Sequence, residues 1–148
     1  MLTRARLLIA TLWVGALWTV GFIVAPTLFT TLADRALAGT IAGGLFRVIA
    51  WLSLVCAAVL IALLLREEKR TTRPLFYLIA GMVLCTLAGY FGLQPTMASL
   101  REVLHAGAAV DPEQLAQARK HFGILHGVST GFYVIQSLLG AGLILKIR

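Results

Sequence analysis

The sequence has few charged residues, and acidic residues are the scarcest of them. Charged residues make up 13% of the 148 residues, against about 25% in an average soluble domain. Asp and Glu together number 6, and none lies inside the long apolar runs of the chain. Proton-coupled carriers commonly use an acidic side chain within the membrane, so this shortage argues against a simple carrier of that class.

Cysteine and known catalytic motifs are also lacking. The two cysteines, Cys56 and Cys85, lie in apolar runs, and no CxxC or CxxCH pattern occurs. A disulfide scaffold, a zinc knuckle and c-type haem attachment therefore find no support. The GxSxG, HExxH and Walker patterns are absent as well, and no two carboxylates share an apolar run. We therefore expect a protein that is not an enzyme.

Apolar residues dominate instead, and they are gathered into four long runs. Hydrophobic residues make up 59% of the chain, and the mean hydropathy is +0.91. Each run can cross a bilayer, which takes about 20 apolar residues as a helix. The first run is longer than the apolar part of a signal peptide, so we expect a retained helix. The sequence predicts a single-domain, all-α four-helix membrane bundle with spans at residues 7–28, 40–65, 75–93 and 120–145.

Residues 94–119 form the longest predicted loop, at the outer face. The spacing of Met97, Leu100 and Leu104 predicts a short amphipathic helix lying at the interface. The run Asp111-Pro112-Glu113 is typical of a helix start. We expect that helix to continue into the fourth span, overhanging the bilayer by about two turns.

Basic residues flank the predicted spans, and the net charge is +7. The side that holds both termini carries eight Lys and Arg residues, and the opposite side carries four. The positive-inside rule then places both termini in the cytoplasm. No arm collects basic residues beside aromatic ones, so the expected partner is a lipid bilayer and not nucleic acid.

The fourth span carries a polar stripe. On a helix, six polar side chains share about 120° of arc: His126, Ser129, Thr130, Tyr133, Gln136 and Ser137. An unpaired polar group in hydrocarbon costs several kcal/mol. We therefore expect this helix to be the inward-facing centre of the bundle.

Arg47 lies within the second span, and an arginine there is a functional candidate. It is about 10 Å from the start of that span and therefore within snorkelling reach of the interface. His126 lies at a similar depth in the fourth span. If the two spans are neighbours, Arg47 and His126 flank an outward-facing polar pocket, with three further side chains below them: Ser129, Thr130 and Tyr133.

The mouth of this predicted pocket could be closed by Asp34, Gln94 or Glu102. A cationic pocket suits an anion, a carboxylate or a lipid head group. The structural alternative is a hydrogen-bond network that only holds the helices together. We expect ligand binding, in transport or in tolerance of a metal or toxicant, with a structural accessory subunit of a larger membrane complex as the alternative.

No cofactor is predicted, although two sets of residues keep a metal in view. Cys56 and Cys85 lie at similar depths, and Met82 is one turn from Cys85, a sulfur set that would suit Cu(I). Buried cysteine is also a common apolar filler. A second set, at the outer face, consists of the three histidines with Met97, but no two histidines have the spacing that pairs them on one helix.

Small residues form faces that allow close helix approach. Gly81 and Gly89 lie on one line in the third span, and Gly123, Gly127 and Gly131 form a GxxxGxxxG line in the fourth. These faces exceed what a lone four-helix bundle needs. We therefore expect a homo-oligomer or a membrane-protein partner.

Three blocks of the sequence together resemble a known family. In chain order they are FIVAPTLFTTLADRALAGTIAGGLFR, GLQPTMASLREVL and FGILHGVST. They resemble the four-helix domain of unknown function that also occurs in transmembrane protein 205 and its relatives. The resemblance is carried by Pro26, Phe29, Gly39, Phe46, Arg47, Pro95, His126 and Ser129. It implies a bacterial inner-membrane protein without a settled activity, and a distant likeness of some members to copper-resistance membrane domains keeps metal handling as an alternative.

Overall fold

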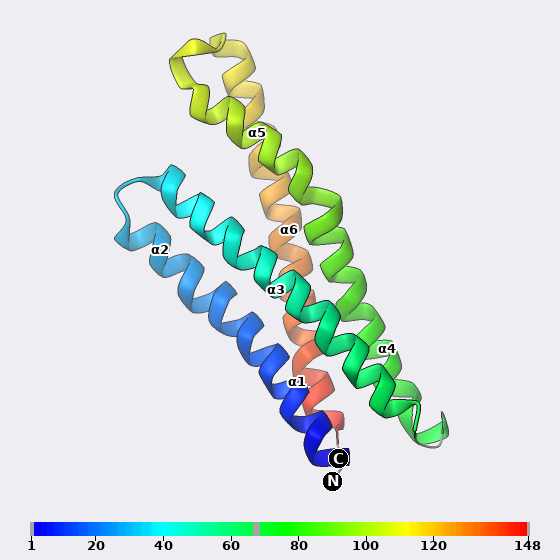
Figure 1. The fold of residues 1–148 in the computed structure, drawn as a ribbon. Coiled ribbons are helices and arrows are strands. Elements are labelled where there is room, and N and C mark those ends of the chain that lie inside the picture. The colour runs from blue at the N-terminus through cyan, green and yellow to red at the C-terminus, as the bar shows by residue number, and fades with distance from the viewer. Residues whose placement is uncertain (1, 67–68, 148) are drawn as a thin grey trace.

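The computed structural model describes residues 2–66 and 69–147, and they form four long helical rods (Figure 1). The first rod consists of α1 (Leu2–Trp18), the π-helix η1 (Thr19–Val24) and α2 (Ala25–Thr31); the second is α3 (Arg35–Leu64). The third consists of α4 (Lys69–Thr86), the π-helix η2 (Leu87–Leu93) and α5 (Gln94–Ala106). The short 3-10 turn η3 (Gly107–Ala109) leads to the fourth rod, α6 (Pro112–Lys146).

Each rod is long and apolar enough to cross a membrane. The two ends of the described chain lie at the same end of the bundle (Figure 1). These observations confirm the predicted all-α bundle of four spans.

Both π-helical segments end just before a proline. Pro26 is the second residue of α2, and Pro95 is the second residue of α5. Proline has no N–H, so the carbonyl four residues before it loses its usual helical partner. In η1 the chain widens to compensate, and the Ala25 N–H donates to the Val20 carbonyl, five residues back. Spans one and three therefore stay continuous, but each contains one wide turn.

Local chemistry explains where three of the helices begin or end. The Asp34 carboxylate accepts hydrogen bonds from the backbone N–H groups of Ala36 (2.8 Å) and Leu37 (3.1 Å), which caps α3. Gly107 follows α5 with a φ of 50°, a backbone conformation that favours glycine. α6 begins at Pro112, directly after Asp111, as the sequence predicts, but the Asp111 side chain makes no capping hydrogen bond.

The connections are more helical than predicted. α5 follows η2 without a break in the helix and packs on α6 (Figure 1). That α5 lies at the membrane interface stays a prediction. The charged turn at 66–74 is also shorter than expected: α4 starts at Lys69 and contains Pro74. Residues 67 and 68 of that turn lie outside the described residues.

The buried core lies in the half of the bundle that holds the termini. Trp13 is 0% exposed and donates through Nε1 to the Ser53 hydroxyl at 2.8 Å, joining α1 to α3. At Gly140 of α6, an added Cβ would lie 2.8 Å from Val14 Cγ2 and 3.3 Å from Met82 Cε. Helices α1, α4 and α6 thus approach closely at a glycine. The core therefore holds together the half of the bundle that contains the termini.

Candidate functional site

Arg47 is held by the third span. Its side chain is exposed, and its Nε donates to the Tyr90 hydroxyl of η2 at 3.1 Å. Tyr90 packs edge-on against Phe91, and Phe91 packs edge-on against Trp51 of α3, with centroid distances of 5.0 Å and 6.0 Å. This aromatic row joins α3 to η2 one turn below Arg47. The predicted pairing of Arg47 with the fourth span is therefore replaced by a contact with the third.

A second basic side chain reaches the same face of α3. An added Cβ on Gly43, one turn from Arg47, would lie 3.3 Å from Arg101 Nη1 and 3.7 Å from Gln94 Nε2. Both side chains come from α5 and are half-buried. Gln94, expected at the mouth of the pocket, thus lies beside Gly43. Sequence reasoning missed Tyr90 and Arg101.

The part of the polar stripe that lies farther from the C-terminal end of α6 does not face the other helices of the bundle. His126 and Thr130 are exposed. The His126 ring stacks on Phe122 of its own helix, with centroids 6.0 Å apart, and the Thr130 hydroxyl donates to the His126 carbonyl at 2.9 Å. Ser129 is half-buried. The inward-facing prediction is therefore wrong for His126 and Thr130, because no helix among the described residues covers that side of α6.

The inner part of the stripe is buried and joins the helices. Gln136 and Ser137 are each 4% exposed. Gln136 Nε2 donates to the Thr86 hydroxyl at 2.9 Å, and Thr86 in turn donates to the Met82 carbonyl at 3.1 Å. This part of the stripe matches the structural alternative, a hydrogen-bond network between α6 and α4.

Tyr133 links three spans. Its hydroxyl donates to the Leu17 carbonyl of α1 at 2.6 Å. Its ring packs edge-on against Phe22 and Phe46, with centroids 6.3 Å and 5.4 Å away. An added Cβ on Gly21 would lie 2.7 Å from Tyr133 Cζ, so the ring occupies the space beside the wide turn of η1. Tyr133 therefore connects the neighbourhood of Arg47, through Phe46, to the first and fourth spans.

The glycine lines of the third and fourth spans differ in whether another helix packs against them. Added Cβ atoms on Gly81 and Gly89 would meet α6 at Leu139 (3.0 Å) and Phe132 (3.9 Å), so these glycines lie at a helix contact. At the other three, an added Cβ would meet no atom within 4 Å: Gly123, Gly127 and Gly131. The GxxxGxxxG face of α6 is therefore not covered by the described part of this chain.

The three sulfur residues are all buried. Cys56 and Met82 belong to the main core cluster, whereas Cys85 is buried outside it. Among the described residues, no group of three or more His, Cys, Asp or Glu side chains could hold a metal ion. A set that includes the Met82 thioether is a different group of ligands, so the soft-metal alternative stays a prediction.

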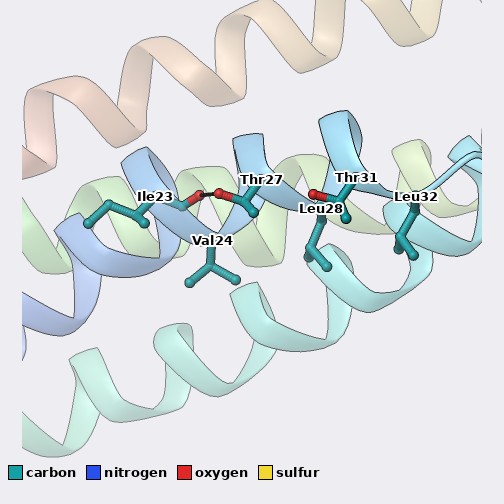
Figure 2. Close-up of a pocket in the computed structure, with 6 residues that line it drawn as sticks. All are labelled: Ile23, Val24, Thr27, Leu28, Thr31 and Leu32. Carbon is teal, nitrogen blue, oxygen red and sulfur yellow. Dashed lines mark hydrogen bonds between the residues drawn. The ribbon is translucent and has the colours of Figure 1, made fainter.

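Two surface hollows lie away from Arg47. One, of about 300 Å³, is lined by a single helical stretch: Ile23, Val24, Thr27, Leu28, Thr31 and Leu32 (Figure 2). Its Thr27 hydroxyl is turned to its own helix and donates to the Ile23 carbonyl at 2.6 Å. The other, also about 300 Å³, lies between α5 and α6 and is lined by Thr96, Leu100, His121, Ile124 and Leu125. Neither hollow has an arginine in its lining, so neither is the predicted cationic pocket.

Residues 8–106 match the model of a domain of unknown function, DUF4149, and the chain therefore belongs to this family. The match includes α3 and η2 and ends with α5, so the contacts around Arg47 lie within it, whereas α6 lies beyond it. No curated protein and no solved structure matches the chain. The finer likeness to transmembrane protein 205 is not part of this match and stays a prediction.

Proposed function

We propose that this member of the DUF4149 family is a non-enzymatic protein of a bacterial inner membrane that binds an anionic ligand through Arg47. The observation that carries the proposal is the exposed guanidinium of Arg47, whose Nε bonds to a neutral phenol at 3.1 Å. Within the described residues, no carboxylate pairs with it. Arginine stays charged and only donates hydrogen bonds, so its terminal NH₂ groups are available to an anion.

The position of Arg47 supports the same interpretation. It lies about 18 Å along α3 from Arg35, at 1.5 Å per residue. A cation at such a depth in a span is costly unless it reaches water or meets a negative partner. A bound anion supplies that partner, whereas the Tyr90 hydroxyl supplies only a dipole.

We place the pocket in the outer half of the membrane, with both termini in the cytoplasm. The basis is the excess of basic residues beside the termini, which the positive-inside rule assigns to the cytoplasmic side. In this proposal Tyr133, which packs on Phe46 beside Arg47, forms the α6 wall. The exposed His126 and Thr130 lie on the uncovered side of α6 and are not part of the pocket. Four helices leave little room for a translocation path, so we propose transport only for an oligomer of this chain or for a complex with a partner.

The test compares Arg47→Gln with Arg35→Gln, an exposed arginine at the start of the same helix. Purified protein in an uncharged detergent is heated with sodium acetate, sodium phosphate or phosphatidic acid, at constant ionic strength. We expect at least one anion to raise the Tm of the wild type and of Arg35→Gln, but not that of Arg47→Gln. No shift with any anion, or an equal shift in all three proteins, would refute the proposal.

A second candidate function, a structural subunit of a larger membrane assembly, is favoured by the uncovered glycine face of α6. Gly123, Gly127 and Gly131 have no atoms within 4 Å of an added Cβ, which leaves room for a helix from another chain. Mass measurement after mild-detergent purification tests it. A particle larger than the monomer that is lost in Gly127→Leu would support this function, and a monomeric wild-type particle would count against it.

A further inference from the structure

Two arginines from different spans converge on one face of α3. Arg47 projects from α3 itself, and Arg101 reaches α3 from α5, with Nη1 3.3 Å from the position of a Gly43 Cβ. Gly43 and Arg47 are four residues apart, so their side-chain positions are about 5–6 Å apart on the same helix face. Because Gly43 has no side chain, the Arg101 guanidinium can lie directly on the helix backbone, one turn from Arg47.

The neutral groups beside these arginines add further donors. Gln94 Nε2 lies 3.7 Å from the same Cβ position, and the Tyr90 hydroxyl accepts from Arg47 Nε. The Tyr90 hydroxyl keeps its own hydrogen to donate. Of the residues that the structure describes, no carboxylate bonds to either arginine, and Asp34, the acid at the start of α3, is engaged in capping the helix. The cluster therefore consists of donors that lack a charged acceptor.

We propose that Arg47 and Arg101 clamp a terminal phosphate group, with Gln94 and Tyr90 as auxiliary donors. The proposal rests on the proposed function, since it names the chemical class of the anion bound at Arg47. A terminal phosphate carries a charge of about −1.5 to −2 near pH 7, which balances two arginines. A carboxylate or a phosphodiester carries a single charge and leaves one guanidinium uncompensated. Arginine also binds phosphate oxygens in a bidentate manner.

The group is accessible to a ligand from outside the bundle. Arg47 is exposed, and the other three residues are half-buried. Free phosphate and the phosphomonoester head group of a lipid such as phosphatidic acid share the chemistry that this clamp recognises. The experiment therefore measures both ligands separately.

Delipidated protein in an uncharged detergent is titrated calorimetrically with sodium phosphate and, separately, with short-chain phosphatidic acid. Three variants change the clamp: Arg47→Gln, Arg101→Gln and Gly43→Ala, whose new methyl, 3.3 Å from Arg101 Nη1, moves the guanidinium by a few tenths of an ångström. Arg119→Gln, an exposed arginine near the start of α6, is the control. We expect each of the two arginine variants to weaken binding at least about tenfold, the scale of a lost hydrogen bond to a charged group. Gly43→Ala should weaken binding less, and the control should bind like the wild type.

The outcomes separate the clamp from the proposed function. If Arg47→Gln abolishes binding while Arg101→Gln and Gly43→Ala bind like the wild type, the clamp is refuted and anion binding at Arg47 stands. Acetate or phosphatidylglycerol binding as tightly as the terminal phosphate also refutes the clamp alone. If no anion binds, or if binding persists in Arg47→Gln, both proposals fail.

Discussion

Gly21→Ala tests whether the ring of Tyr133 occupies the wide turn of η1. An added Cβ would lie 2.7 Å from Tyr133 Cζ and 2.9 Å from its hydroxyl oxygen, closer than any relaxed contact. The ring cannot give way cheaply, because its hydroxyl bonds to Leu17 and the ring itself packs edge-on against two phenylalanine rings. Overpacking of this kind costs about 1–3 kcal/mol, against a gain of about 0.5–1 kcal/mol for Gly→Ala in a helix. We expect a net loss of about 1–2 kcal/mol, and up to about 1 kcal/mol more if the Leu17 hydrogen bond breaks.

The assay is reversible unfolding by SDS in mixed micelles, with Gly15→Ala as the matched control. Gly15 lies in the same span, and an added Cβ there meets nothing within 4 Å, so Gly15→Ala should be neutral or slightly stabilising. Combining Gly21→Ala with Tyr133→Leu should remove most of the added cost, because the smaller side chain no longer fills the turn. Equal stability of Gly21→Ala and Gly15→Ala would show that the ring does not sit against Gly21, and the reasoning would be refuted.

Two further predictions concern the inner core, and both are read from the same unfolding curves. Gly140→Ala should lower the free energy of unfolding by about 1–2 kcal/mol, because the new methyl would lie 2.8 Å from the stiff, buried Val14 side chain. Gly127→Ala, with open space around it, should not lower it. Equal effects of the two substitutions would contradict the packing of α6 on α1 at Gly140. Ser53→Ala should lower the free energy of unfolding by about 1–3 kcal/mol, because it leaves the buried Trp13 Nε1 without its acceptor. If Ser53→Ala destabilises a Trp13→Phe protein by the same amount, this hydrogen bond is not the source of the loss.

The sequence predicted the class of fold because hydrophobic runs of membrane length determine it almost alone. The helix start at Pro112 was also predictable, since capping chemistry is local. The shape of the third span was not. Residues 94–119 were predicted as a loop with a separate short helix, whereas α5 follows η2 without a break. Within a membrane, neighbouring helices and a π-helical turn allow a helix to continue past a proline such as Pro95.

The partners of Arg47 could not be read from periodicity, because they depend on which spans are neighbours. The prediction assumed that spans two and four are adjacent, whereas α3 packs chiefly against α1 and α4. Arg101 was taken for a surface residue of an interfacial helix, and Tyr90 was not singled out. Gly43 was the sequence feature that could have pointed to Arg101. A glycine one turn from an arginine within a predicted span allows another side chain to approach the helix backbone. Spacing identified the stripe on α6 correctly but could not say which part of it this chain covers.

The two halves of the molecule should respond independently to substitution, and their glycines show why. Gly21 and Gly140 face rigid groups, a held tyrosine ring and a β-branched valine, so a methyl there strains the core. Gly43 faces the ends of two flexible side chains, Arg101 and Gln94, which can move aside at little cost to the fold. Gly43→Ala should therefore leave the unfolding curve nearly unchanged while weakening phosphate binding, and Gly140→Ala, in the main core, should do the reverse. If both substitutions affected stability and binding together, the outer site could not be treated as separate from the inner scaffold, and the interpretation of Gly43 as a seat for Arg101 would fail.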